Sequence, residues 1–169
     1  MVSLQTSMTA YNNNIGSFIS YLQFEKRYSQ HTIASYNTDL KEFFEYLHKQ
    51  FEVNDPASVT TVFVRSWLAH LKGARNIAAR SIRRKASSLK SFFKYLMRQG
   101  VITNTPMANI ILPKTAKRLP VYVEQQHTDT LFSYVEFPED WQGKTDKLVM
   151  ELLYHTGMRR SELVKIKKN

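Results

Sequence analysis

The sequence predicts an all-α fold, and three observations lead to this prediction. Apolar residues recur at helical spacing in several segments of the 169-residue chain. Glycine or proline follows most of these segments, as expected where helices end. No strand-like alternation bounded by hairpin signals occurs among them. Hydrophobic residues make up 43% of the chain, which is enough for a packed core rather than a disordered chain.

Helical segments are predicted before the first proline-rich stretch at about residues 13–27, 30–51, 61–72 and 77–99. Ser29 is a suitable N-cap for the second segment, and Asn54-Asp55-Pro56 interrupts the chain after it. Gly73 and Gly100 follow the third and fourth segments. The apolar faces of the first three comprise Ile15, Phe18, Ile19, Leu22, Ile33, Tyr36, Leu40, Phe43, Leu47, Val64, Trp67, Leu68 and Leu71. These segments predict a four-helix bundle.

Residues 103–124 differ in character from what precedes them. Pro106, Pro113 and Pro120 forbid a continuous helix, and the basic side chains here are Lys114, Lys117 and Arg118. This pattern predicts an extended interdomain linker. Further helices are expected at about 124–135 and 144–156, with an acidic loop around 137–140 between them. The predicted organisation is a helical domain at 1–105, a linker at 106–122, and part of a second domain at 123–169.

The net charge of +10 is unevenly distributed. Residues 1–120 hold 17 Lys/Arg and 6 Asp/Glu, whereas residues 121–169 hold 7 and 8. Between Asp55 and Glu124 there are 13 basic residues and no acidic one. Because a solvated surface normally mixes both signs, such a stretch predicts a polyanionic partner. Nucleic acid is favoured over a membrane surface, since the basic residues lie on a helix whose other face is apolar.

The fourth helical segment carries most of this charge on one face. On a helical wheel, Ile82, Ala86, Leu89, Phe93 and Leu96 share one side. An opposite arc of about 120° at the helical spacing contains Arg80, Arg83, Arg84, Ser87, Lys90, Ser91, Lys94 and Arg98. Lys85 departs from the arc, at the edge of the apolar face, where its stem could snorkel towards water. A plain solvated face would include glutamates pairing with these cations, and there are none. The arc is interpreted as a surface that follows nucleic-acid phosphates and does not indicate a sequence preference.

A second predicted DNA contact lies at the start of the second segment. Hydrogen-bond donors gather there around a helix N-terminus, in Lys26, Arg27, Ser29, Gln30, His31 and Thr32. The same residues also fit an ordinary serine N-cap with an exposed first turn.

Several other classes of protein are disfavoured. No apolar run approaches the length of a membrane span, and the N-terminus has no export signal. The absence of cysteine excludes disulfides and thiolate metal sites and fits a reducing cytoplasm. The five histidines have no metal-ligand spacing, so no metal is expected.

Residues 154–163, Tyr-His-Thr-Gly-Met-Arg-Arg-Ser-Glu-Leu, form the most distinctive motif. Gly157 is placed to end one helix, and Ser161 and Glu162 suit the first turn of the next. Arg159 is therefore expected at the turn between two helices, with a planar fork that matches a phosphate. On these residues alone, a surface arginine after a glycine-capped helix is an equally good interpretation.

This motif resembles the first arginine box of the tyrosine recombinases, which include phage integrases and Xer-type enzymes. Residues 28–43, with Tyr28-Ser29-x-x-Thr32, and residues 84–96 resemble the opening and the fourth helix of that family's core-binding domain. The prolines from Pro106 to Pro120 are similar to its interdomain join. The resemblance implies a SAM-like core-binding bundle, followed by the first helices of a mixed α/β catalytic domain that is incomplete here.

The resemblance also implies a function, which is site-specific DNA recombination through a 3′-phosphotyrosyl intermediate. Arg159 matches the first catalytic arginine of the family, and Glu162 matches the acidic position of the same box, in a supporting role. Neither a cofactor nor a small-molecule substrate is implied. The implied partners are double-stranded DNA and, for the full-length protein, other recombinase subunits in a synaptic tetramer.

Departures from the family's pattern limit the expected activity of this chain. No histidine is followed by arginine three residues later, and all nine tyrosines precede Arg159. A fragment that binds DNA and is inactive alone is therefore expected, from a bacterial or phage protein acting in the cytoplasm. The alternatives are a non-catalytic helical DNA-binding module, or a helical protein-interaction domain with an acidic partner.

Overall fold

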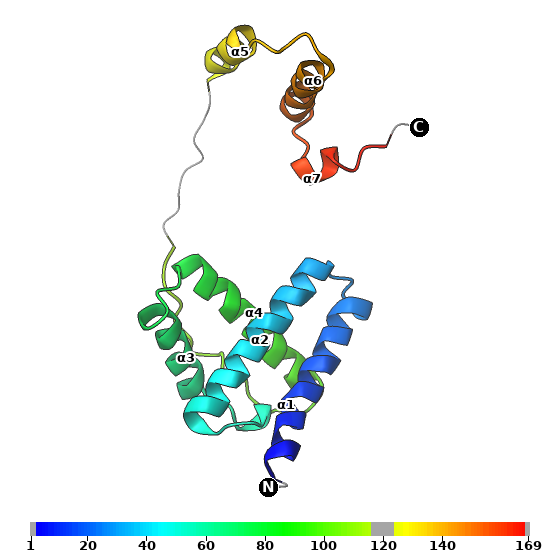
Figure 1. Ribbon diagram of the computed structural model, residues 1–169. Helices are drawn as coiled ribbons and strands as arrows, with labels where there is room; N and C mark the ends of the chain where they lie inside the picture. The colour runs from blue at the N-terminus through cyan, green and yellow to red at the C-terminus, as the bar shows by residue number, and fades with distance from the viewer. Residues whose placement is uncertain (1–2, 116–123, 168–169) are drawn as a thin grey trace. The chain divides into compact units, whose positions relative to one another are not determined.

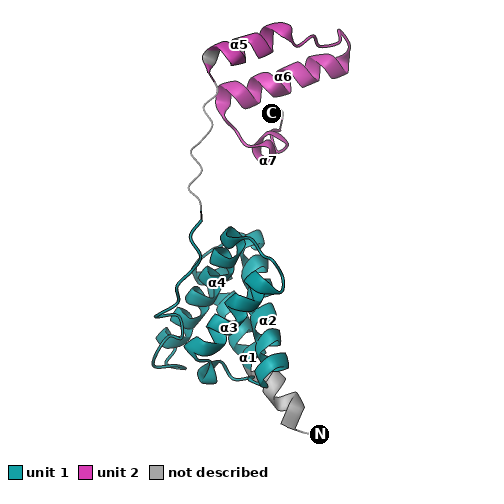
Figure 2. Ribbon diagram, turned by 90° about the vertical axis from the view of Figure 1, so that its left-hand side faces the viewer, with its two compact units in different colours: residues 1–117 teal, residues 118–169 magenta. Residues whose placement is uncertain are grey.

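The computed structural model describes residues 3–115 and 124–167, and over these residues all regular elements are helical. The all-α prediction is thus confirmed for the described part of the chain. The chain divides into two compact units, Met1–Lys117 and Arg118–Asn169 (Figure 2). No helix within the described residues is long and apolar enough to cross a membrane.

Unit 1 is a bundle built around α2. Its elements are α1 (Ser3–Ser20), a π-helical turn η1 (Tyr21–Glu25), α2 (Gln30–Phe51), a 3₁₀ turn η2 (Pro56–Ser58), α3 (Thr61–Gly73) and α4 (Ala79–Arg98). Helix α2 contacts α1, α3 and α4, and α1 and α3 each contact α4 as well (Figure 1). Helices α2 and α4 therefore pack against each other, and α1 and α3 each pack against both of them.

Aromatic rings fill the space between these helices. The ring of Phe43 on α2 lies 5.1 Å from that of Trp67 on α3 and 6.3 Å from that of Phe93 on α4. Phe18 on α1 meets Phe92 on α4 edge to face, at 5.4 Å between centroids. All five side chains are buried. Since each full burial of such a side chain stabilises the fold by about 1.5–3 kcal/mol, this cluster joins the helices of unit 1.

The second, third and fourth predicted helices agree with the structure. Helix α2 has the predicted bounds, and the Ser29 hydroxyl caps it by accepting from the backbone N–H of Thr32 at 3.3 Å. The first helix was predicted wrongly, since α1 begins at Ser3 rather than near residue 13. The run Asn12-Asn13-Asn14 resembles a loop in sequence. However, Tyr11 continues the apolar face of α1 and stacks on Phe44 of α2 at 5.1 Å, so the helix continues through the asparagines.

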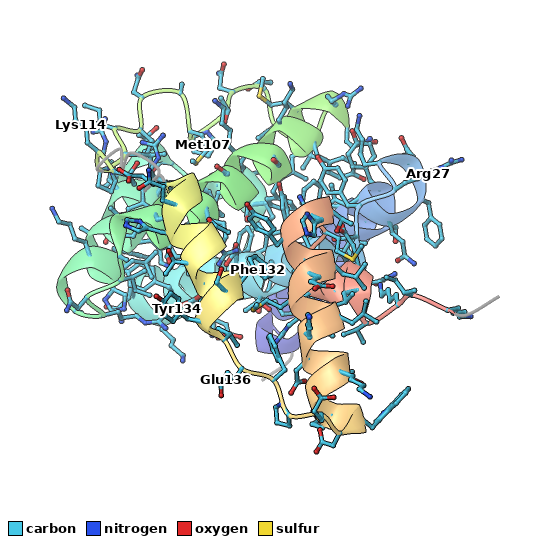
Figure 3. The ribbon with its side chains drawn as sticks, turned by 90° about the horizontal axis from the view of Figure 1, so that it is seen from above. Arg27, Met107, Lys114, Phe132, Tyr134 and Glu136 are labelled. Atoms are coloured by element: carbon cyan, nitrogen blue, oxygen red, sulfur yellow. The ribbon has the colours of Figure 1, made fainter. Side chains whose placement is uncertain are left out.

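The first part of the predicted linker lies against unit 1 rather than extending freely. Met107 is only 9% exposed, and Ile110 and Leu112 pack against the core. Arg65 donates to the carbonyl of Asn109 at 3.1 Å, which attaches this segment to α3. Figure 3 marks Met107 and Lys114 along it. Lys117, Arg118 and Pro120 lie outside the described residues.

A buried polar cluster joins α2 to α4. Asp39 is 1% exposed and accepts from both Nη atoms of Arg84, at 2.6 and 2.9 Å, and from Ser88 Oγ at 2.7 Å. Lys85 Nζ donates to Asp39 at 3.1 Å and also pairs with Glu42. The prediction that Lys85 snorkels to water is wrong. Its side chain is 10% exposed, because carboxylates on α2 lie opposite it.

Unit 2 comprises α5 (Gln125–Tyr134), α6 (Trp141–Thr156) and α7 (Arg160–Leu163). Helix α6 begins three residues before the predicted start, because the Asp140 carboxylate caps it by accepting from the backbone N–H of Gly143 at 2.8 Å. A Cβ at Gly143 would clash with the carbonyl of Pro138, so this tight turn requires glycine. The rings of Phe132 (labelled in Figure 3) and Tyr154 lie 5.0 Å apart and connect α5 to α6.

Replacing Asp39 with alanine is expected to destabilise unit 1 by about 3–5 kcal/mol, because it leaves the buried ammonium of Lys85 with less compensation. Urea unfolding followed by circular dichroism measures this change. Glu45→Ala removes the same charge from an exposed position of α2 and serves as the control, with an expected effect within about 0.5 kcal/mol. Equal unfolding midpoints for the two variants would contradict the structural role of Asp39.

Candidate nucleic-acid interface

The outer face of α4 is exposed and positively charged. Ile82, Leu89 and Phe93 are buried on the inner side of the helix. Exposed residues on the opposite side are Arg80, Arg83, Arg84, Ser87, Lys90, Lys94 and Arg98, and Ser91 is half-buried among them. At 1.5 Å per residue, the 20 residues of α4 extend over about 30 Å. That length is close to one turn of B-DNA, so the face could run alongside several phosphates.

The cations of this face differ in how far the fold already engages them. Arg84 directs both Nη atoms to Asp39, although its side chain is 51% exposed. Arg83 donates to the carbonyl of Pro113 at 3.4 Å. Arg80, Lys90 and Lys94 make no hydrogen bond or ion pair with another described residue. These three are the cations most available to an external anion, and a helical wheel treats them the same as Arg84.

The predicted second contact, between η1 and α2, contains both a structural cap and exposed cations. The Ser29 hydroxyl accepts from the backbone N–H of Thr32 at 3.3 Å and also hydrogen-bonds to the Thr32 hydroxyl at 2.9 Å, so Ser29 acts as an ordinary N-cap. His31 is exposed, and its carbonyl accepts from Ser35. Arg27 lies at the outer edge of unit 1 (Figure 3), in the left-handed region with φ of 52°. Lys26 lies over the ring of Tyr21, 5.8 Å from its centroid.

The two predicted DNA contacts, the basic face of α4 and residues 26–32, lie next to each other at the C-terminal end of α4. Arg98 Nη1 donates to the hydroxyl of Tyr21 on η1 at 2.8 Å. The helical spacing predicts Arg98 on the basic face but indicates no role for Tyr21. No local pattern in the sequence connects these two residues, because 77 residues separate them. At the other end of α4, the linker contributes Lys114, which is exposed. Lys117 and Arg118, also predicted contacts, lie outside the described residues.

The arginine box of unit 2 has the predicted local geometry. Gly157 ends α6 in the left-handed region with φ of 64°, and Arg159 is the N-cap residue of α7. The Glu162 carboxylate accepts from the backbone N–H of Arg159 at 2.8 Å and from its guanidinium at 3.0 Å. The backbone hydrogen bond, followed by that from the guanidinium, lowers the pKa of Glu162. Arg159 is 83% exposed, so its fork is oriented by Glu162 and accessible to a phosphate.

Among residues 3–115 and 124–167, no group of three or more histidines and carboxylates could hold a metal ion. The exposed arginine and lysine side chains of α4 and of the arginine box can bind and orient phosphates.

Comparisons with known proteins identify a family and several relatives. Residues 15–100 match the family model described as phage integrase, N-terminal SAM-like domain. The chain is 35% identical over 164 residues to the tyrosine recombinase XerC of Leptospira interrogans, covering 96% of this chain and 52% of that protein. It is 37% identical over 159 residues to XerC of Bacillus subtilis, covering 93% and 51%. XerD of Halalkalibacterium halodurans is 31% identical over 157 residues, with 93% and 52% covered.

Among solved structures, the XerA recombinase matches with a TM-score of 0.48 and 20% identity, over 92% of this chain and 50% of that one. The chain spans about half the length of the curated relatives it matches.

The pKa of Glu162 gives a testable pH dependence. The ionised Glu162 carboxylate stabilises the α7 cap fully when the pH lies above the ordinary pKa of a glutamate. This stabilisation is lost as the pH falls through the lowered pKa of Glu162. Arg159→Ala removes the guanidinium but keeps the backbone N–H, so the pKa of Glu162 should rise only part of the way back. An NMR titration of the Glu162 carboxyl carbon measures this, with Arg160→Ala as the control. A titration of the parent at the ordinary value would disprove the cap.

Proposed function

The chain belongs to the phage integrase family of tyrosine recombinases, and from this we propose that it is the DNA-binding part of a site-specific recombinase. The observation that carries the proposal is the outer face of α4, where Arg80, Lys90 and Lys94 are exposed and unpaired by any described residue. Like charges this close repel one another, and a DNA backbone supplies the missing counter-charge. In this proposal the partner is double-stranded DNA.

The cations of α4 have different roles in the proposal. Arg80, Lys90 and Lys94 bind phosphates directly, with Ser87 and Ser91 as hydroxyl donors between them. Arg84 has a mainly structural role, because Asp39 already occupies both of its Nη atoms. At the two ends of α4, Lys114 extends this surface on one side, and Lys26 and Arg27 extend it on the other. Such contacts position a duplex without selecting its sequence.

For the whole protein we propose DNA integration or recombination through a 3′-phosphotyrosyl intermediate. Arg159 would stabilise charge on the reacting phosphate, and Glu162 would orient its guanidinium. Other recombinase subunits would join it in a synaptic tetramer, in the cytoplasm of a bacterium. The family membership and the oriented, exposed Arg159 support this role.

A non-catalytic DNA-binding module remains a second candidate, because the basic face of α4 alone would serve it equally well. It gives no reason for the Arg159–Glu162 pair. A protein-interaction domain would require an acidic protein surface in place of DNA, and competition between DNA and such a protein separates the two.

Binding of this chain to duplex DNA is expected to depend strongly on salt. If about five to eight phosphates are neutralised, log K should fall with log[salt] with a slope of about −5 to −7. Arg80→Gln combined with Lys90→Gln should make the slope shallower by about 2. Fluorescence anisotropy over a salt series measures it. The control, Lys41→Gln with Lys49→Gln, removes the same charge from exposed positions of α2. An unchanged slope in the α4 variant would refute the assignment of this face.

The 169-residue chain is expected to bind DNA without forming a covalent adduct, because it contains no residue that matches the family's tyrosine nucleophile. In a full-length protein that includes this chain, Arg159→Ala should slow adduct formation by about 10²–10³-fold and leave DNA affinity nearly unchanged. A nicked suicide substrate analysed on a denaturing gel measures this. Arg160→Ala, in the neighbouring exposed arginine, is the control. Adducts formed at the parental rate by Arg159→Ala would overturn the role of the arginine box.

A further inference from the structure

A surface hollow of about 200 Å³ lies between η1 and the C-terminal half of α4. Its floor is formed by core residues, including Phe18 and Leu22. Its polar groups come from two segments distant in sequence, which contribute Tyr21, Lys26, Tyr28, Ser91, Lys94, Tyr95 and Arg98. Unit 1 alone forms the hollow.

The charge of this hollow is of one sign. Three cations line it, and no carboxylate does. Glu25 is the acidic residue nearest in sequence, and it lines a neighbouring hollow on another side of Tyr21 and Tyr95. An anion entering between Lys26 and Arg98 would therefore meet attraction from both segments without a competing carboxylate.

Tyr21 holds Arg98 in place before any ligand binds. Its hydroxyl accepts from Arg98 Nη1 at 2.8 Å. The ring of Tyr21 packs against two other rings, and its centroid lies 5.0 Å from that of Tyr95 and 6.3 Å from that of Phe18. The guanidinium is thus oriented by a residue that is itself packed on the core. Such preorganisation lowers the entropic cost of binding.

The backbone around the hollow is irregular in two places. The chain widens from α1 into the π-helical turn η1, where the backbone N–H of Lys26 donates to the carbonyl of Tyr21 at 3.1 Å. Arg27 then adopts a left-handed conformation, which is costly for a residue other than glycine. Together these features bring Lys26 over the ring of Tyr21. π-Helical turns and strained residues of this kind concentrate at functional sites.

We propose that this hollow binds a single backbone phosphate of DNA, with Lys26, Ser91, Lys94 and Arg98 as donors and Tyr21 as the positioning residue for Arg98. The proposal rests on the proposed DNA-binding function and adds a defined anchor to it. A phosphate fits better than a nucleobase, because the rings of Tyr21 and Tyr95 already contact each other and three cations line the hollow. A fixed phosphate would set the register of the duplex along α4.

Two substitutions test the hollow separately from the rest of α4. Tyr21→Phe keeps the net charge and the ring and removes only the hydroxyl that orients Arg98. Binding to a short fluorescent duplex should weaken about five-fold, the usual effect of one hydrogen bond, with an unchanged salt slope. Arg98→Gln removes one phosphate contact, and the slope should become shallower by about 0.9.

The matched control is Tyr46→Phe, which also removes a tyrosine hydroxyl with a hydrogen bond, in this case to Ser66 at 2.9 Å, away from the hollow. It should bind DNA like the parent, and urea unfolding of each variant shows whether unit 1 stays folded. Parental affinity and slope in both Tyr21→Phe and Arg98→Gln would overturn the hollow, even if Arg80 and Lys90 prove to bind DNA. Absence of salt-dependent DNA binding by the parent would instead overturn the proposed function itself.

Discussion

The buried carboxylate of Asp39 is the interaction on which unit 1 depends most. It accepts two hydrogen bonds from the guanidinium of Arg84, one from the ammonium of Lys85 and one from the hydroxyl of Ser88, all on α4. These bonds permit only one rotation of α4 about its axis. In that rotation the aromatic residues face α2, and Lys90 faces outward. A buried charged cluster adds little net stability compared with apolar packing, but it can make one arrangement unique. Here that arrangement is the one that exposes the basic face.

Much of this fold could be predicted from local sequence, and the failures have identifiable physical causes. Helix α2 was predicted to the residue because Ser29 supplies a cap and the apolar spacing is regular. The start of α1 was missed because three asparagines imitate a loop, whereas tertiary packing of Tyr11 on Phe44 extends the helix. The environment of Lys85 was missed for a related reason. A wheel of one helix contains no information about Asp39 and Glu42 on another.

The residues of the candidate site could be predicted from local sequence, but their partners within the fold could not. Sign and spacing identified the cations of α4, and glycine chemistry identified the turn before Arg159. Neither signal distinguishes a cation already paired within the fold, such as Arg84, from an unpaired one, such as Lys90. Nor could they predict the hydrogen bond between Tyr21 and Arg98, since 77 residues separate the two. Long-range pairing is what the structure adds.

The pairing of charges inside unit 1 also affects how fast a partner would arrive. Asp39 and Glu42 offset most of the charge of Arg75, Arg84 and Lys85, so the remaining excess is carried by side chains at the surface. Their field extends about 8 Å into physiological buffer before ions screen it. A duplex approaching α4 is therefore attracted before any contact forms, and collisions in many orientations become productive. Asp39 and Glu42 thus leave unit 1 with a long-range field dominated by its exposed cations.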